Sequence, residues 1–322
     1  MPRTRSLPRL WYRRRGQGEP LLLITGFTIS AAVFDPILPL YEPHFECIVY
    51  DHRASGRSDK PPLLTSMAEL AGDAARVLDE LGIESAHVSG LSMGGMVAQE
   101  MAIRFPERVR GLMLGCSTSG GPRAIRPSLK ELGTLGATTV KALREPGRPW
   151  LSAALFSDEF RRDHPERVRE LLRYFAKHRA PAYGALAHLM ASVYHDTTSR
   201  LHLIEAPTLV MHGERDQMAP LANARMLAGR IPDAELAIVP GAGHAYGLEA
   251  PQLSLDLVLD WLRRRGPIEA GRPRQGLIAQ AEPVTRALGL PIGALRTGAS
   301  LAGLVADKIG GGGDVAVDRR TA

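Results

Sequence analysis

Six short apolar runs recur along the chain, and each is bounded by glycine, proline or polar residues. They lie at residues 20–25, 45–50, 86–89, 109–114, 208–211 and 234–239. Runs of this length that are rich in branched aliphatic residues are typical of strands buried on both faces of a sheet. The pattern therefore predicts six buried strands.

Helical periodicity fills the stretches between several of these runs. Helices are predicted over residues 66–81, 93–105 and 250–264. At the first of them, Ser66 and Glu69 form a capping-box pattern, and Gly82 follows the end. Strands that alternate with helices predict an α/β fold with a mostly parallel sheet, flanked by helices and joined by right-handed crossovers.

The alternation breaks between residues 121 and 200, where helical stretches occur without a clear strand pattern and prolines divide the chain into short pieces. We interpret residues 121–200 as a helical lid inserted into a core formed by residues 1–120 and 201–265. Residues 266–322 are rich in glycine, proline and alanine, and we expect this C-terminal extension to be partly disordered. Weak helical amphipathicity occurs within it over residues 274–289 and 291–309.

Composition fits a globular protein with one large core. The 322 residues are 44% hydrophobic and 23% charged, and no apolar run is long enough to cross a membrane. The two cysteines, Cys47 and Cys116, sit in apolar runs and are predicted to be reduced core thiols of a cytoplasmic protein. No Cys/His cluster has metal-ligand spacing, so no metal site is expected.

The net charge of +6 does not indicate a nucleic-acid partner, because the arginines are spread along the chain. The arginine-rich start is also compatible with a transit peptide. However, residues 10–12 followed by Gly16-Gln17-Gly18 predict a strand that enters a hairpin turn, so residues 13–15 are assigned to the fold. We expect no secretory signal, because no apolar leader segment is visible.

One short motif carries chemistry. Gly90-x-Ser92-x-Gly94 stands between a predicted strand and a predicted helix, which is the context that a nucleophile elbow requires. Side chains at the two glycine positions would collide with the neighbouring strand and helix. The helix that follows Ser92 favours negative charge at its N-terminus. Such a string also arises by chance, but this context favours a nucleophilic serine.

A nucleophilic serine needs a base, and the base needs an acid that orients it. Asp216 follows one predicted strand and His244 follows the next, which matches the hydrolase chain order of serine, acid and histidine. Both lie at the carboxyl ends of strands, where active sites of open parallel sheets gather. Glu214 is an alternative acid, ranked below Asp216 because Asp216 stands closer to Pro220 and the predicted helix start.

Other histidines are alternative bases. His87 and His212 lie within predicted strands, where a hydrogen-bonded core role is the more frequent one. His188 and His195 fall in the helical insertion and could line a pocket there.

At this point the chain resembles the α/β-hydrolase superfamily, in particular its lid-bearing esterase, 3-oxoadipate enol-lactonase-like and non-haem haloperoxidase-like members. The resemblance covers about residues 10–265 and rests on three segments besides the triad order. They are Asp51–Asp59, which is similar to the pattern D-x-R-G-x-G-x-S, then Ser92–Ala98 and Phe105–Val109. Ala54 stands where the family usually has glycine, and Thr25-Gly26 stands where it has His-Gly.

The resemblance implies that the backbone N–H groups of Phe27 and Met93 form the oxyanion hole. It also implies a serine hydrolase that cleaves carboxylic esters or lactones through an acyl-enzyme, without a metal or an organic cofactor. The expected ligand is a small ester or lactone with an apolar part. Alternatives are a C–C bond hydrolase or perhydrolase of the same fold, or a non-catalytic small-molecule binding protein.

The insertion is expected to cover the site and set its specificity. Some of its large apolar side chains should form the core of the lid, and others should line an apolar pocket. They are Trp150, Leu151, Leu155, Phe156, Phe160, Tyr174, Phe175, Tyr183, Leu186, Leu189, Met190 and Tyr194. The insertion also carries arginines that are expected on a solvated face, with a carboxylate-binding role as the alternative. These are Arg161, Arg162, Arg167, Arg169 and Arg173.

Overall fold

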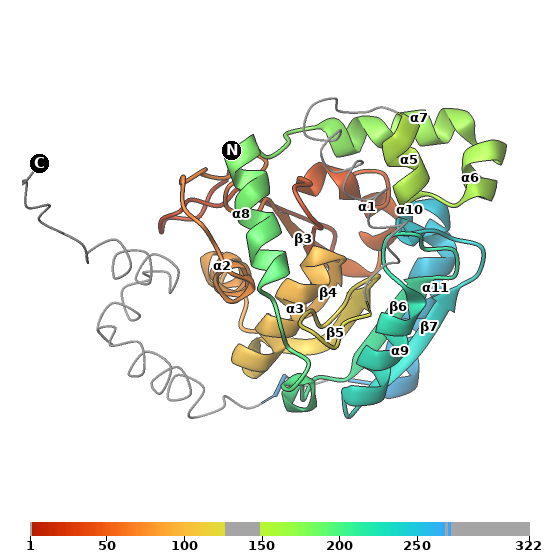
Figure 1. The fold of residues 1–322 in the computed structure, drawn as a ribbon. Coiled ribbons are helices and arrows are strands. Elements are labelled where there is room, and N and C mark those ends of the chain that lie inside the picture. The colour runs from red at the N-terminus through yellow and green to blue at the C-terminus, as the bar shows by residue number, and fades with distance from the viewer. Residues whose placement is uncertain (1, 126–148, 268–269, 272–322) are drawn as a thin grey trace, which may run out of the picture.

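The computed structural model describes residues 2–125, 149–267 and 270–271. Seven strands form one sheet in the order β1-β3-β2-β4-β5-β6-β7, and all of them except β1 run parallel to their neighbours (Figure 1). The strands are β1 (Tyr12–Arg15), β2 (Glu19–Ile24), β3 (Phe45–Tyr50), β4 (Ala86–Leu91), β5 (Val109–Gly115), β6 (Thr208–Gly213) and β7 (Ala234–Val239). The predicted mostly parallel α/β architecture is therefore confirmed.

Helices cover both faces of this sheet (Figure 1). On one face, α2 (Met67–Glu80), α3 (Met93–Arg104) and α9 (Leu221–Arg230) bury their apolar sides in one cluster with the strands. On the other face, α1 (Leu38–Tyr41), α10 (Tyr246–Glu249) and α11 (Pro251–Arg265) contribute to a second cluster. Short 3-10 helices lie at Ala31–Phe34, Pro106–Arg108 and Leu201–Leu203.

The sequence signals at the ends of α2 act as predicted. The Ser66 hydroxyl accepts a hydrogen bond from the Glu69 backbone N–H at 3.2 Å, and the Glu69 carboxylate accepts one from the Ser66 N–H at 2.9 Å. Gly82 follows the helix with φ of 68°, a left-handed conformation that glycine adopts without strain. The capping box and the glycine stop are therefore confirmed.

The predicted hairpin after β1 is wrong. β1 pairs antiparallel with β3, and β2 lies on the far side of β3. The turn between β1 and β2 crosses the start of β3, and its two outer glycines make this crossing possible. A Cβ on Gly16 would lie 2.3 Å from the Phe45 carbonyl oxygen, and one on Gly18 would lie 2.8 Å from that of His44. The glycines mark a close backbone crossing rather than a two-strand turn.

The prediction of burial on both faces fails for β7. This strand forms the edge of the sheet, and its Leu236 and Ile238 remain 36% and 38% exposed. An apolar run alone does not distinguish a central strand from an edge strand.

The chain between β5 and β6 forms the helical insertion. Its described helices are α5 (Pro149–Leu155), α6 (Asp158–Asp163), α7 (Pro165–Ala176) and α8 (Ala182–Val193). A bridge between Gly120 and Asp196 joins the two ends of the insertion. Residues 274–289 and 291–309, where weak amphipathicity was noted, lie outside the described residues. No helix within the described ranges is both long and apolar enough to cross a membrane.

Candidate active site

Ser92 occupies a strained turn between β4 and α3. Its backbone angles are φ 56° and ψ −118°, a region that costs a non-glycine residue about 1–3 kcal/mol. A Cβ added to Gly90 would lie 2.2 Å from the carbonyl oxygen of Gly94. A Cβ added to Gly94 would lie 2.3 Å from the carbonyl oxygen of Ile24. Only glycine fits at either position, so the predicted elbow geometry is present.

The acid and the histidine predicted from the sequence are in direct contact. Nδ1 of His244, after β7, lies 2.8 Å from Oδ2 of Asp216, after β6. The second carboxylate oxygen of Asp216 accepts hydrogen bonds from the backbone N–H groups of Met218 at 2.7 Å and Ala219 at 2.9 Å. Nδ1 therefore donates to Asp216, which leaves Nε2 of His244 as the nitrogen able to accept a proton.

The electrostatics of Asp216 favour the charged form. Burial raises the pKa of this carboxyl, but facing His244 and the hydrogen bonds that it accepts lower it more, so the pKa ends below its ordinary value. The side chain is only 1% exposed, so the carboxylate is shielded from competing water. A buried and charged acid of this kind stabilises an imidazolium cation.

Neighbouring strand ends link this pair to Ser92. The Ser92 N–H donates to the carbonyl of Gly115, the last residue of β5, at 2.7 Å. The next residue is Cys116. Its Sγ, a carboxylate oxygen of Asp216 and a ring nitrogen of His244 all lie within 4.8 Å of one another. Because β4, β5, β6 and β7 are consecutive in the sheet, the three predicted residues share one carboxyl edge.

Glu214 is not placed to orient the histidine. Its side chain is exposed and accepts a hydrogen bond from the Gly241 backbone N–H at 3.0 Å, whereas the His244 ring contacts Asp216. Among the alternative bases, His212 lies 3.4 Å from Asp216 but bonds the Ala219 carbonyl at 2.9 Å, and burial lowers its pKa.

The other alternative bases do not contact Asp216 in the structure. His87 contacts Glu19 at 2.9 Å, and burial lowers the pKa of His87. His188 and His195, for which a place in a pocket lining was one option, are buried at 0% and 4% exposure. Burial lowers the pKa of each to about 4.

The segment that the resemblance assigns to the oxyanion hole lies beside Ser92. A Cβ on Gly26 would lie 3.5 Å from the Ser92 Cβ, and Phe27 follows it. Met93 is the first residue of α3, where a backbone N–H has no partner within the helix. In place of the usual histidine, Thr25 donates its hydroxyl to the Ile29 carbonyl at 3.0 Å, which closes the loop locally.

A buried histidine holds the same loop through a hydrogen bond. Nε2 of His52 donates to the Thr25 carbonyl oxygen at 3.1 Å, because a carbonyl can only accept. Edge-on against His52, at 5.8 Å between ring centroids, lies His188 of α8. Nε2 of His188 in turn donates to the Arg53 carbonyl at 2.9 Å. Sequence reasoning missed this pair because the two residues are 136 positions apart.

A hydrogen-bond network joins Ser92 to both ends of the insertion, and sequence reasoning also missed it. The Ser117 hydroxyl donates to the Ser92 carbonyl at 2.9 Å. Gln99, fully buried in α3, donates to the Thr118 carbonyl at 3.1 Å and accepts from the Thr197 hydroxyl at 2.6 Å. The available signal was an uncharged polar residue among the buried positions of α3.

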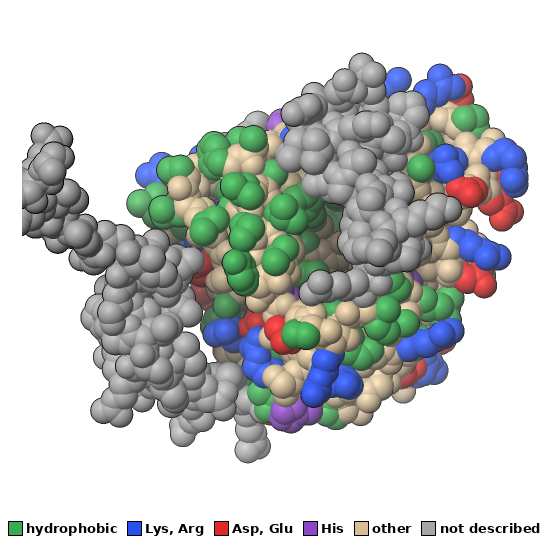
Figure 2. All heavy atoms as spheres, in the orientation of Figure 1, with side chains coloured by type: hydrophobic (Ala, Val, Ile, Leu, Met, Phe, Trp, Pro, Cys, Tyr) green, Lys and Arg blue, Asp and Glu red, His purple; other side chains and the backbone are tan. Residues whose placement is uncertain are grey.

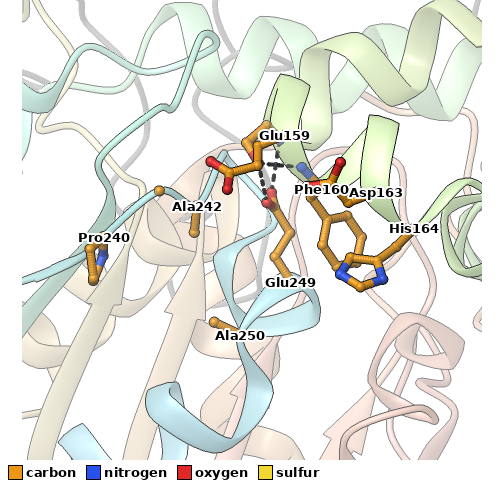
Figure 3. A pocket seen from close by; sticks show the side chains of 10 residues that line it. Glu159, Phe160, Asp163, His164, Pro240, Ala242, Glu249 and Ala250 are labelled. Atoms are coloured by element: carbon orange, nitrogen blue, oxygen red, sulfur yellow. Dashed lines mark hydrogen bonds between the residues drawn. The ribbon is translucent and has the colours of Figure 1, made fainter.

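Glu249 connects the insertion to the loop that carries His244. Its carboxylate accepts from the Ser157 N–H at 3.1 Å, the Ser157 hydroxyl at 2.7 Å and the Gly243 N–H at 2.9 Å. Burial raises the pKa of Glu249 above its ordinary value. Figure 3 shows this carboxylate at the wall of a surface pocket of about 230 Å³, lined by α6 residues such as Phe160 and by the loop around Ala242.

Cys116 lies close to Asp216 and His244, and its thiol favours the protonated form. Among the described residues, Cys116, Asp216 and His244 are the group of His, Cys, Asp or Glu side chains close enough to share an ion. Burial raises the pKa of the Cys116 thiol well above its ordinary value, and metals bind the thiolate. Both cysteines are buried and free, which confirms the prediction of reduced core thiols.

The lid side chains divide in a way that the sequence did not reveal. The inner side of α7, including Phe175, packs into the second core cluster, and Phe175 meets Phe156 edge-on at 6.3 Å. Four of the five lid arginines pair with carboxylates of α6 or α7, which fits the predicted solvated face. Several large apolar residues of α8 instead face solvent, which contradicts the expectation that they belong to a core or a pocket.

Comparisons with known proteins agree with this fold. The sequence profile described as alpha/beta hydrolase fold matches residues 19–251. A poly(3-hydroxyalkanoate) depolymerase from Ectopseudomonas oleovorans is 28% identical over 260 residues, which are 80% of this chain and 89% of the relative. A thermophilic esterase from Thermogutta terrifontis has a TM-score of 0.69 at 27% identity, covering 82% of this chain and 99% of its own. Est816, described as an N-acyl homoserine lactone degrading enzyme, has a TM-score of 0.66 at 28% identity, with 81% and 100% covered.

Proposed function

The chain belongs to the α/β hydrolase fold family, and from that premise we propose that it is a serine hydrolase that cleaves carboxylic esters or lactones through an acyl-enzyme. The observation that carries the proposal is the 2.8 Å contact between Asp216 and His244, on the same sheet edge as the strained Ser92. A buried acid, a histidine and a half-buried elbow serine at the carboxyl ends of β6, β7 and β4 are the parts that acyl transfer requires.

In the proposed reaction, the Ser92 oxygen attacks the substrate carbonyl while its proton passes to Nε2 of His244. Asp216 holds the ring and stabilises the imidazolium. The backbone N–H groups of Phe27 and Met93 donate to the oxyanion, and each such donor is typically worth about 3 kcal/mol of barrier. Collapse of the intermediate expels the alkoxide, which takes the proton from His244. Water then attacks the acyl-enzyme with His244 as base, and the acid leaves.

Two similar proteins support the choice of ester or lactone bonds. The Thermogutta terrifontis protein is named as an esterase and Est816 as an enzyme that degrades N-acyl homoserine lactones, while another relative is named for carbamate hydrolysis. A C–C bond hydrolase or a perhydrolase would use the same three residues, and a non-catalytic binding protein would keep only the pocket. Substrate and reactivity tests separate these alternatives.

Labelling with a fluorophosphonate probe tests the nucleophile. The wild-type protein should be labelled at Ser92, and Ser92→Ala should lose both the label and the hydrolysis of p-nitrophenyl esters and lactones. Ser89→Ala, three residues earlier on β4, is a matched control and should keep both. Labelling that persists in Ser92→Ala would refute the assignment, and labelling without turnover of any ester or lactone would favour the other substrate classes.

A further inference from the structure

Helix α8 has an inverted distribution of side-chain sizes. Its buried positions hold small residues and one histidine, namely Gly184, Ala185, Ala187, His188 and Ala191. Its large apolar side chains point outward. We call these the α8 apolar face, which consists of Tyr183, Leu186, Leu189, Val193 and the adjoining Tyr194, exposed by 46%, 54%, 41%, 63% and 79%. Figure 2 shows hydrophobic side chains gathered over this helix. Such a contiguous patch marks an interaction site more often than chance exposure.

The inner contacts of α8 prevent it from turning this face inward. A Cβ on Gly184 would lie 2.3 Å from the Ala54 carbonyl oxygen, so no larger side chain fits at that position. His188 donates to the Arg53 carbonyl at 2.9 Å. The hydroxyl of Tyr183 donates to the Lys60 carbonyl at 3.0 Å, which ties the N-terminal end of the helix to the core. The α8 apolar face is therefore a fixed outer surface.

Charge around the helix selects the kind of partner. Residues 171–195 contain no aspartate or glutamate, whereas Arg173, Lys177 and Arg179 precede α8. A second copy would bring the same cations to a face-to-face contact, in a chain whose net charge is already +6, and Asp196 is the exposed carboxylate that follows the helix. An anionic lipid surface offers both missing features, since its headgroups attract the cations and its acyl chains accept the apolar side chains.

We propose that the α8 apolar face docks the protein on the surface of anionic lipid bilayers, with Arg173 and Lys177 against the headgroups. At 12 residues the helix is too short to span a bilayer, so the contact is peripheral. The proposal does not depend on the reaction assigned to Ser92. It predicts lipid binding in a protein that hydrolyses nothing.

Co-sedimentation of the full chain with vesicles tests the proposal. The Ser92→Ala protein is used throughout, so that lipid hydrolysis cannot alter the vesicles. Binding is expected to vesicles that mix phosphatidylglycerol with phosphatidylcholine, and to weaken as salt rises from about 0.05 to 0.5 M. Leu186→Glu and Leu189→Glu should each weaken it by about tenfold or more, because each places a charge among acyl chains. Arg173→Gln with Lys177→Gln should weaken binding only to the anionic vesicles.

Leu253→Glu is the matched control, because Leu253 is 40% exposed on α11 and lies outside the α8 apolar face. It should bind as the parent does, and melting temperatures should show that all variants are folded. Equal losses in Leu253→Glu and Leu186→Glu would overturn the proposal, as would binding that ignores lipid charge or no binding at all. A dimer in lipid-free solution that Leu186→Glu dissociates would assign the face to a second copy instead.

Discussion

The sheet edge and the helical insertion differ in how many side chains hold them in place. At the edge, main-chain groups fix the proposed catalytic residues, as when the Ser92 N–H bonds Gly115 and two backbone N–H groups hold Asp216. The insertion meets the core through side chains, such as His188 on the Arg53 carbonyl and Ser157 on Glu249, in addition to backbone bonds. Changes at the edge should therefore alter turnover, and changes in the lid contacts should alter stability with less effect on chemistry.

Asp216→Asn should have the largest effect, because it removes the charge that orients His244. The Asp-to-Asn substitution in the Ser-His-Asp triad of serine proteases has an effect of this kind, and kcat should fall by about 10⁴-fold while the melting temperature changes little. Steady-state kinetics on a p-nitrophenyl ester would measure this. Glu214→Gln, two residues away and exposed, is the matched control and should retain near-normal activity. If Glu214→Gln lost activity and Asp216→Asn kept it, Glu214 would be the acid that orients the histidine.

His195, which follows the C-terminal end of α8, should make the unfolding free energy depend on pH. Both of its ring nitrogens are buried without a hydrogen-bond partner among the described residues, and the Glu100 carboxylate lies 4.0 Å away. Burial lowers the pKa of His195 from 6.5 to about 4, so its contribution to stability is complete above pH 6.5 and is lost as the pH falls through 4. His195→Leu removes this dependence.

The variant should therefore gain about 3 kcal/mol of unfolding free energy relative to wild type between pH 7 and pH 4. Urea unfolding at the two pH values would measure the gain, while ester hydrolysis at pH 7 should change little. His202→Gln, an exposed position, should show no comparable gain. The same pH dependence in both variants would contradict the assignment to His195.

Gln99 lies where edge and lid meet, so Gln99→Leu should affect both, though less strongly. Loss of its bonds to Thr118 and Thr197 should lower the unfolding free energy by about 2 kcal/mol, because the Thr118 carbonyl loses a buried donor. Chemical denaturation gives this value, and kcat reports any relaxation of Ser117 against Ser92. Gln252→Leu removes an exposed hydrogen bond from a side-chain amide to Asp256 on α11, and it should lower the unfolding free energy far less. Equal costs would mean that the network is not structural.

The smallest predicted effect is a gain in stability. Ala54 has φ of 61°, where alanine is strained and glycine is not. Ala54→Gly should raise the unfolding free energy by about 0.5–1 kcal/mol without changing kinetics, because the site does not use its side chain. Thermal melting would detect it, with Ala75→Gly inside α2 as a control that should lose stability. A loss in both would mean that the contact of Ala54 with α8 outweighs the backbone strain.

The sequence predicted those parts of the molecule that depend on local pattern. Ser66 and Glu69 cap α2 as expected, and the positions of Ser92, Asp216 and His244 follow from strand ends alone. It did not predict contacts between residues far apart in the chain, such as His52 with His188 or Gln99 with Thr197. These depend on how the insertion folds back on the core.

Two errors have the same origin. The glycines at 16 and 18 resemble a hairpin turn, yet they serve the crossing of β3, which begins 27 residues after Gly18. The apolar residues of α8 resemble a core stripe, although the helix packs through its alanines and Gly184. In both cases the sequence pattern was given its most frequent interpretation, and the neighbour that explains the residues was not visible in the sequence.

The bridge between Gly120 and Asp196 has an evolutionary consequence. It brings the two ends of the insertion side by side, so the chain leaves the core and returns to it at one place. Because closing a loop costs little more when the loop is longer, insertions of different length can begin and end at this place without a change in the order of the strands. A new substrate preference could thus arise through changes within one contiguous stretch of gene.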